Sequence, residues 1–334
     1  MIIALDAMGG DEAPNEIVKG AILAVNEAEG FDVLLIGDEN AINETLKSEG
    51  YSGDRISVRA TTEVIGNEEV PTKAVKQKKN SSMVVGFGLL RDKKVDCFVS
   101  AGNSGALLAG AVMILKKLPG IDRPAVASVV PTKNGNVVLL DSGFNTNIKP
   151  MNYVQFAYLG GAYAKAAFGI EDPRVGLVNI GVEDKKGTPD VKEANDLLKK
   201  AKINYVGNIE SREFFNDAAD VIVTDGFTGN IMLKLIEGAS DFFFGLIKDV
   251  MSGTSMAKVG ALLMMNELKN LKRKLDSDVL GGAPLLGVDG LLIKSHGSST
   301  SRTIKYVLMK AKTTVEANMI DHLKEELAAL SKDR

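Results

Sequence analysis

The 334-residue chain contains one cysteine, two histidines and no tryptophan. Its single thiol, Cys97, excludes an internal disulfide, and two histidines without a cysteine partner argue against a zinc site built from soft ligands. Cys97 lies in the apolar run VDCFVS, where a small buried thiol is the ordinary outcome. We therefore expect a protein of the reducing cytoplasm that forms no cysteine acyl-enzyme.

An excess of charge of one sign is also missing. Forty Lys and Arg residues against forty-three Asp and Glu residues leave a net charge of −3, which provides no global field for nucleic acid. The first residues, MIIALDAMGGDEAP, lack the basic segment of a signal peptide and are typical of a first strand. Charged residues interrupt every apolar run before the ~18 residues that a spanning helix needs. We expect neither a nucleic-acid partner nor a membrane span.

Several motifs of common enzyme classes are absent from the sequence. No serine stands in a G-x-S-x-G elbow with a downstream acid and histidine, which argues against an α/β-hydrolase. No G-x-x-x-x-G-K-[ST] loop is present to hold a nucleoside triphosphate, and no convincing dinucleotide fingerprint supports a dehydrogenase. The chemistry is therefore expected to use no enzyme nucleophile.

Short runs rich in Val, Ile and Leu alternate with longer helical patterns. Near-continuous apolar strands that alternate with helices predict a parallel sheet covered on both faces. No repeat, linker or break in composition marks a boundary, so we predict one α/β domain over residues 1–334. The runs are IIALDA, DVLLIGD, DCFVSAG, NVVLLDSG, RVGLVNIG and DVIVTDG.

Four of these runs end in small or polar clusters, and ligands of open α/β sheets bind outside the carboxyl ends of the strands. One cluster, SAGNSGALLAG, is a glycine-rich turn into a helix, which suits a phosphate or an oxyanion. Asn103 and Ser104 add donors there, whereas Gly102 and Gly105 alone would also be explained by a tight turn. The clusters begin at Asp6, Ala101, Asp141 and Asp225.

The segment TDGFTGNIMLK repeats this design at residues 224–234. It ends a strand with Asp225, places Thr228 or Asn230 near the helix cap, and puts Lys234 one turn further in. A plain Thr or Asn cap explains part of the pattern. It does not explain why Asp225, Asn230 and Lys234 occur together.

Two further segments carry groups suited to anions. NIGVEDKKGTPD leaves a strand at Asn179 and presents Lys185 and Lys186, which either bind phosphate or a departing thiolate, or are simply solvated. Near the C-terminus, His296 precedes Ser298 and a serine-rich helix start, a position suited to an anion or a proton transfer, although a lone histidine is more often structural.

Residues 228–275 are predicted to form a protruding helical region. Apolar residues of 230–250 share one helical face, which indicates core or a dimer interface. The following stretch, 257–275, has a broad apolar surface accompanied by lysines and an arginine, which suits anionic lipid, an acidic carrier protein or the dimer mate. The contact residues expected are Leu262, Leu263, Met264, Met265, Lys269, Lys272 and Arg273.

Taken together, LDAMGGD, SAGNSGAL, LLDSGFN, NIGVEDKKG, VTDGFTGNIMLK and GGAPLLGVDG with HGSS resemble the bacterial phosphate acyltransferases, the acyl-carrier-protein:phosphate transacylases of phospholipid synthesis. The resemblance covers almost the whole chain. It implies a Rossmann-like α/β fold similar to phosphotransacetylases, with a largely parallel sheet, helices on both faces and a protruding helical pair. It also implies a homodimer and no metal or nucleotide cofactor.

The implied reaction is the reversible transfer of a fatty acyl group from acyl carrier protein to inorganic phosphate. The acyl phosphate would serve a membrane-bound glycerol-phosphate acyltransferase, so the chain is expected at the inner face of the membrane, in contact with anionic lipid. Phe144 stands where the family usually has Ala, and Val182 where the residue is often polar. If Phe144 points into the cleft, it narrows the acyl or phosphate site.

We hypothesise that phosphate attacks the thioester directly. Lys186 and Lys234 then offset negative charge, Asn179 and Asn230 donate hydrogen bonds, and Asp225 orients a donor or handles a proton. The residues expected to bind substrate are Asp6, Gly102, Asn103, Ser104, Asn145, His296 and Ser298. Alternatives are an acyl-CoA phosphotransacylase, a decarboxylating dehydrogenase on a related scaffold, and a non-enzymatic scaffold at the membrane surface.

Overall fold

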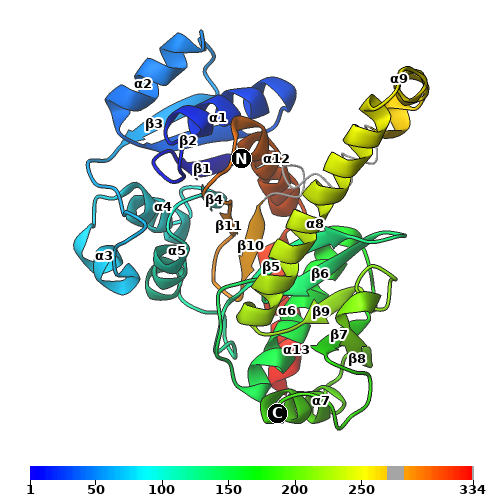
Figure 1. The fold of residues 1–334 in the computed structure, drawn as a ribbon. Coiled ribbons are helices and arrows are strands. Elements are labelled where there is room, and N and C mark those ends of the chain that lie inside the picture. Colours follow the sequence, from blue (N-terminus) through cyan, green and yellow to red (C-terminus); the bar gives the residue numbers. More distant parts are fainter. Residues whose placement is uncertain (269–281, 333–334) are drawn as a thin grey trace.

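The computed structural model describes residues 1–268 and 282–332, and within them eleven strands form one sheet (Figure 1). The order across the sheet is β3-β2-β1-β4-β11-β10-β5-β6-β9-β7-β8. Every one of the six apolar runs predicted as strands is a strand. The bounds are β1 Ile2–Asp6, β2 Asp32–Gly37, β3 Ile56–Ala60, β4 Cys97–Ser100, β5 Ala125–Pro131, β6 Asn136–Leu140, β7 Val175–Asn179, β8 Tyr205–Glu210, β9 Val221–Val223, β10 Ala283–Leu286 and β11 Leu292–Lys294.

Both outer parts of the sheet are parallel, and the centre is not. Strands β3, β2, β1, β4 and β11 run parallel on one side, and β6, β9, β7 and β8 on the other. Between them β10 is antiparallel to β11 and β5, and β5 is antiparallel to β6. The predicted α/β fold with a largely parallel sheet is therefore confirmed, while the antiparallel centre was not predicted.

Helices cover both faces of the sheet. Successive strand residues point to opposite faces, and apolar side chains on both faces pack against helices. On β1, Ile3 and Leu5 pack into the cluster that contains α1 and α12, whereas Ala4 packs into the cluster that contains α4 and α5. The helices beside the sheet are α1 Asn15–Glu27, α2 Glu39–Ser48, α3 Pro71–Gln77, α4 Ser82–Arg91, α5 Ser104–Gly110, α6 Pro150–Phe168, α7 Pro189–Leu198, α12 Ser301–Glu316 and α13 Met319–Lys332.

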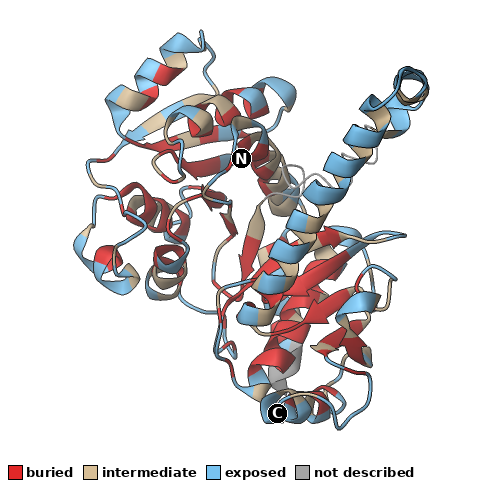
Figure 2. Ribbon diagram, viewed as in Figure 1, coloured by how far each residue is buried: buried red, intermediate tan, exposed pale blue. Residues whose placement is uncertain are grey.

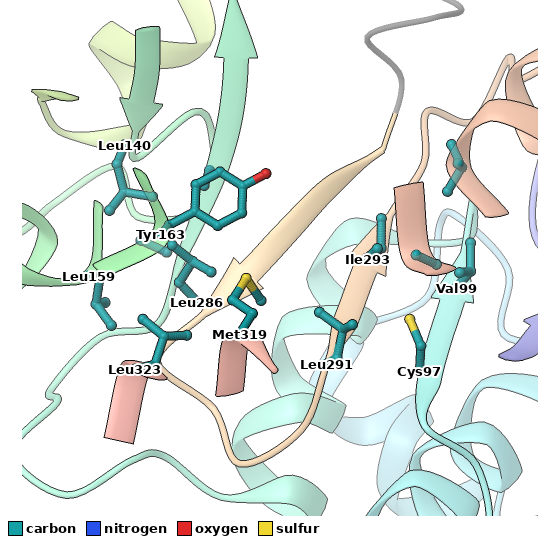
Figure 3. Close-up of a cluster of buried hydrophobic side chains, with 14 of the residues drawn as sticks. Cys97, Val99, Leu140, Leu159, Tyr163, Leu286, Leu291, Ile293, Met319 and Leu323 are labelled. Atoms are coloured by element: carbon teal, nitrogen blue, oxygen red, sulfur yellow. The ribbon is translucent and has the colours of Figure 1, made fainter. Parts of the chain in front are cut away.

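The main core runs across the centre of the sheet. Figure 3 shows Cys97 and Ile293 beside neighbouring strands, with Leu286, Tyr163 and Met319 continuing the same apolar layer toward α6 and α13. Cys97 is fully buried there, and burial raises the pKa of its thiol. The expectation of a buried cysteine is therefore confirmed, and a thiol in this environment is inert.

Helix α8 (Gly226–Ser252) leaves the sheet and projects with α9 (Ser255–Leu263) from the rest of the molecule (Figure 1). Its only buried residues are Gly226 and Gly229, and Figure 2 shows it mostly exposed. Phe242 and Phe243 are each 60% exposed. Met232 and Ile236 pack against the core cluster below β6 and β9, so the interpretation as core holds for the first turns of this face, and the interpretation as an interface stays a prediction for the rest.

The segment expected to be one helix over 257–275 is interrupted, since α9 ends at Leu263 and a turn at Met264 follows. Leu262 and Leu263 are 66% and 82% exposed. Residues 269–275 lie outside the described part of the chain, and with them the predicted contacts Lys269, Lys272 and Arg273. No helix in residues 1–268 or 282–332 is both long and apolar enough to span a bilayer.

Candidate active site

A cavity of about 550 Å³ lies between α8 and the antiparallel centre of the sheet. Its walls come from α8, β5, the turn after β6, the paired strands β10 and β11, and the turn before α12. A cavity of this size is typical of small-molecule sites. Five of the residues predicted to act in catalysis or binding line it, namely Ser104, Asn230, Lys234, His296 and Ser298.

Two lysines face this cavity from different elements. Lys234 lies on α8, and Lys294 is the last residue of β11. Burial lowers the pKa of Lys294, the charge of Lys234 lowers it further, and Glu237 opposes the shift. Lys294 was not among the predicted site residues. It ends the strand LIK, so the tendency of ligands to bind at the carboxyl ends of strands could have identified it. The two lysines offer positive charge to an anion, while Glu237 and Asp241 of α8 line the same cavity as its acidic groups.

Hydroxyl groups surround the two lysines. The Ser128 hydroxyl in the middle of β5 donates to the Ser142 hydroxyl after β6 at 2.7 Å, which ties the turn after β6 to β5. His296 Nδ1 lies 2.8 Å from the Ser298 hydroxyl. These contacts hold the serine hydroxyls in place before a ligand binds. Binding therefore costs little side-chain entropy.

Asp141 organises the turn that follows β6. Its buried carboxylate accepts hydrogen bonds from the backbone N–H and the side-chain amide of Asn145, both at 2.7 Å, and from the Val126 N–H at 3.1 Å. Burial raises the pKa of Asp141 and these hydrogen bonds lower it. The Asn145 carbonyl in turn accepts from the Gly226 N–H at 2.7 Å. Asn145, predicted to bind substrate, is buried and joins this turn to α8 instead of lining the cavity.

Asp225 caps α8. Its carboxylate accepts the N–H groups of Phe227 and Thr228 at 2.9 Å and the Thr228 hydroxyl at 2.7 Å. Thr228 lies near the helix cap as predicted, but the capping residue itself is Asp225, so a plain Thr or Asn cap does not explain the segment. Asp225 does not line the cavity. It can affect the chemistry only by setting the direction of α8, which carries the residues that do line it.

Gly229 allows the close approach of α8 to the sheet. A β-carbon at this position would lie 2.0 Å from the Asp141 carbonyl oxygen, and backbone cannot yield by that amount. The first turn of α8 therefore rests directly on the end of β6. This contact places Asn230 and, one turn later, Lys234 in the cavity wall.

Asp6, Gly102 and Asn103 shape the neighbouring turn instead of lining the cavity. Buried Asp6 accepts the Ser100 hydroxyl at 2.7 Å, and burial raises the pKa of its carboxyl. Asn103 caps α5 by accepting the Ala106 N–H at 2.9 Å, while its amide donates to the Gly66 carbonyl at 3.0 Å. Of the residues predicted to bind an anion in this turn, only Ser104 lines the cavity.

Asn179 and Lys186 lie on a separate loop. The Asn179 amide donates to the Lys186 carbonyl at 3.1 Å and accepts the Ile180 N–H at 2.8 Å, so Asn179 closes the loop after β7. The Lys186 side chain is exposed, and neither residue lines the cavity. Strand β9 separates β7 from β6. The catalytic roles of Asn179 and Lys186 stay predictions.

The two departures from the family pattern differ in their placement. Phe144 is among the residues that line the cavity, and its side chain packs against the core cluster that contains α4 and α5. Val182 is 63% exposed on the loop after β7. Within residues 1–268 and 282–332, no group of three or more His, Cys, Asp or Glu side chains is arranged to hold a metal ion.

Comparison with known proteins places the chain in a family. The model of the family described as fatty acid synthesis protein matches residues 1–322. The chain is 51% identical over 326 residues to a phosphate acyltransferase from Acetivibrio thermocellus, covering 98% of this chain and 96% of that protein. It is 45% identical over 330 residues to one from Thermoanaerobacter pseudethanolicus, covering 99% and 98%.

Among solved structures, a phosphotransacetylase from Streptococcus pyogenes is similar in fold. The TM-score is 0.62 at 16% sequence identity, and the match covers 95% of this chain and 94% of that one. At this level of identity the likeness concerns the arrangement of strands and helices. The fold expected from the sequence is thereby confirmed.

Proposed function

The chain belongs to the phosphate acyltransferases, and from this premise we propose that it transfers a fatty acyl group from the thioester of acyl carrier protein to inorganic phosphate. The product of this reaction is an acyl phosphate, a precursor for phospholipid synthesis. The observation that carries the proposal is the convergence of Lys234 and Lys294 on one cavity.

Two ammonium groups at this position suit a phosphate dianion. A lysine binds phosphate as a point charge, and attraction between charges is stronger in a partly buried site than in water. The unfavourable proximity of Lys234 to Lys294 is relieved when an anion enters between them. Glu237 and Asp241 line the same cavity, so the support for phosphate comes from the two ammonium groups together with the hydrogen-bond donors of the wall, and not from the net charge of the cavity.

The reaction needs no enzyme nucleophile, because a phosphate oxygen already carries negative charge. This oxygen forms a bond to the thioester carbon, and the carbonyl oxygen becomes an oxyanion. When the tetrahedral intermediate collapses, the carbon–sulfur bond breaks and its electron pair leaves with the sulfur, which takes up a proton as the carrier thiol. Holding both reactants in position supplies several kcal/mol, up to ~7–11 in favourable cases.

Each residue has a proposed part in this step. Lys234 and Lys294 neutralise the phosphate and the oxyanion, and Asn230 donates a hydrogen bond from the same wall. Ser104, His296 and Ser298 complete the donors around the cavity. Asp6, Gly102, Asn103, Asn145 and Asp225 are proposed to position these groups rather than to touch substrate.

The projecting helices are proposed to serve assembly. Leu235, Phe242, Phe243 and Leu246 expose between 45% and 69% of their surface on α8, which suits pairing with a second copy of the chain. Beyond them, Leu262 and Leu263 lie at the far end of α9, and we propose that they enter the lipid surface. Burying four or five such side chains contributes roughly 6–15 kcal/mol gross, whereas each lysine near anionic lipid adds about 1 kcal/mol.

The test supplies the purified chain with palmitoyl-carrier protein or palmitoyl-CoA, each with and without phosphate, and follows acyl phosphate by mass spectrometry. Phosphate-dependent product from the carrier-protein thioester is the expected result. Product from the CoA thioester alone would instead indicate an acyl-CoA phosphotransacylase. Absence of product from either donor would contradict the proposal and favour a scaffold at the membrane surface.

A further inference from the structure

A second cavity, of about 410 Å³, lies on the face of the sheet opposite to α8. It is bounded by α6, α12 and α13, and it meets the first cavity only at Val129 of β5. Aromatic and thioether side chains dominate its wall, among them Tyr163, Phe168, Tyr306 and Met309. Figure 3 shows Tyr163 beside the sheet and Met319, another lining residue, at the start of α13.

Lys310 is a cationic residue in the wall of this second cavity. The Lys310 ammonium on α12 donates to the Gly282 carbonyl at 2.7 Å, and within residues 1–268 and 282–332 it has no other side-chain partner. Burial lowers the pKa of Lys310 to about 8, so the group is still mostly charged at pH 7. An ammonium that keeps its charge without a carboxylate leaves two N–H donors for a ligand.

A second polar group faces the same space without a partner. The Tyr163 side chain is 2% exposed, and its hydroxyl makes no hydrogen bond with any described residue. The hydroxyl is therefore able to donate a hydrogen bond to a ligand in the cavity. The Phe168 ring packs edge-on against Tyr163, with ring centres 6.0 Å apart, and continues the apolar wall outward.

We propose that this cavity binds a single-chain anionic amphiphile, such as a fatty carboxylate or an acyl phosphate. The anionic head group accepts hydrogen bonds from Lys310 and the Tyr163 hydroxyl, and the chain lies along Phe168, Tyr306 and Met309. A phosphate or carboxylate alone would leave the aromatic wall without a partner. A neutral lipid would leave the ammonium without its charge compensated.

Occupation of this cavity is coupled to the first one through β10. The Gly282 carbonyl that Lys310 holds belongs to a residue that lines the first cavity. The next residue, Ala283, pairs with Lys294 across the antiparallel ladder. A head group that shares the Lys310 ammonium weakens its hydrogen bond to the Gly282 carbonyl, which loosens the start of β10 and shifts Lys294, the residue paired with Ala283. This coupling rests on the proposed function, whereas the binding itself does not.

The binding test uses the full-length chain and radiolabelled laurate in equilibrium dialysis. Lys310→Met removes the charge and keeps an unbranched apolar side chain of similar size, and Ala166→Phe fills the cavity from α6. We expect laurate affinity to fall about tenfold or more in both variants. The matched control, Lys47→Met, removes an exposed lysine of α2 that lines neither cavity, and it is expected to bind laurate as the wild type does.

Two outcomes would overturn the binding proposal: no saturable binding by the wild type, or equal affinity in the wild type and in Ala166→Phe. Should Lys310→Met fail to fold, Ala166→Phe still decides the question. Repeating the titration with dodecyl phosphate separates the two head groups, because tighter binding than laurate assigns the site to an acyl phosphate and weaker binding to a fatty acid.

A kinetic arm tests the coupling. Saturating laurate is expected to change the KM for phosphate by about threefold or more in the wild type and to leave it unchanged in Lys310→Met. An unchanged KM in the wild type would contradict the coupling. Failure of the proposed function shows separately, as absence of turnover in the wild type without any amphiphile.

Discussion

Lys234 on α8 and Lys294 on β11 line one cavity, although sixty residues of sequence separate them. Burial lowers the pKa of Lys294, and the charge of Lys234 adds to the effect. Groups with shifted pKa values gather at functional sites because the arrangement that binds a ligand is unfavourable without it. The stability of this protein should therefore respond to pH and to phosphate at this pair.

The sign of the pH effect follows from the lowered pKa. Between the folded and unfolded pKa values of Lys294, the unfolded chain binds more protons, so its contribution to stability rises with pH. Replacing Lys294 with Met removes this dependence. We expect Lys294→Met to be more stable than the wild type at pH 7 and the difference to shrink as the pH rises toward the ordinary lysine pKa. Urea unfolding at a series of pH values checks this, and a constant difference would contradict it.

Phosphate should reverse the order of stability of the wild type and Lys294→Met. Saturation to a hundred times the dissociation constant stabilises a protein by about 2.7 kcal/mol. We expect phosphate to raise the melting temperature of the wild type and to have little effect on Lys294→Met. Sulfate at equal ionic strength separates occupation of the site from general salt effects. Equal phosphate shifts in both proteins would remove Lys294 from the binding site.

The three lysines proposed to act in catalysis should differ in importance. Lys234 and Lys294 line the cavity, so replacing either with Met should lower kcat/KM for phosphate by about 100-fold or more, as loss of an oxyanion donor does elsewhere. Lys186 is exposed and lies outside the cavity wall, so its charge acts through solvent. We expect a smaller loss in Lys186→Ala. Steady-state kinetics at varied phosphate concentration measures the loss of kcat/KM in each of the three lysine variants and so checks this prediction.

Unchanged turnover in Lys186→Ala would remove that residue from the mechanism. A loss in Lys186→Ala as large as in Lys234→Met would show that the loop after β7 closes over the cavity during the reaction. Lys185→Ala, one residue away on the same loop, is the matched control for loss of surface charge.

Gly229 and Gly238 form a matched pair on α8. A β-carbon at Gly229 meets the Asp141 carbonyl at 2.0 Å, whereas one at Gly238 meets nothing within 4 Å. Gly229→Ala should therefore destabilise the chain by about 1–3 kcal/mol or more and misplace Asn230 and Lys234. Gly238→Ala should instead stabilise it by about 0.5–1 kcal/mol, as alanine does in a helix.

Chemical denaturation and turnover of the two variants check this prediction together. Equal stability of the two would mean that the first turn of α8 does not rest on the end of β6. A normal melting temperature with lost turnover in Gly229→Ala would show that the helix shifts as a unit, and that its direction sets the position of Lys234.

The strands and the location of the cavity were largely predictable from the sequence. Apolar runs that end in Asp6, Asp141 and Asp225 predict strands whose carboxyl ends gather at one edge. That pattern placed Asn230 and Lys234 correctly in the cavity wall. The sequence also indicated buried strands on both sides of the sheet, because runs such as NVVLL are apolar at consecutive positions.

The centre of the sheet and the roles of several polar residues were not predictable. Lys294 reaches the cavity only because β11 inserts between β4 and β10, a pairing between segments distant in the sequence. Asn145 and Asp225 carry the same residue types that bind ligands, but nearby backbone groups take up their hydrogen bonds. Whether an amide serves a ligand or a turn depends on such neighbours, which residue patterns do not reveal.

The proposed lipid contact of α9 gives a last prediction. Leu262 and Leu263 are 66% and 82% exposed at the projecting end of the molecule, and no residue of α9 lines the cavity. Replacing both with Glu places two charges where apolar side chains would enter the bilayer. We expect this variant to lose binding to vesicles of anionic and zwitterionic lipid in a flotation assay, while turnover of a soluble carrier-protein thioester stays within about twofold of the wild type.

The control for added charge is Leu23→Glu, because Leu23 is 45% exposed on α1 and belongs to no proposed contact. This control should bind vesicles as the wild type does. Unchanged vesicle binding in the α9 variant would contradict the lipid contact. Intact vesicle binding with a raised KM for the carrier-protein thioester would instead assign Leu262 and Leu263 to the docking of the carrier, because lipid contact does not enter an assay with soluble substrates.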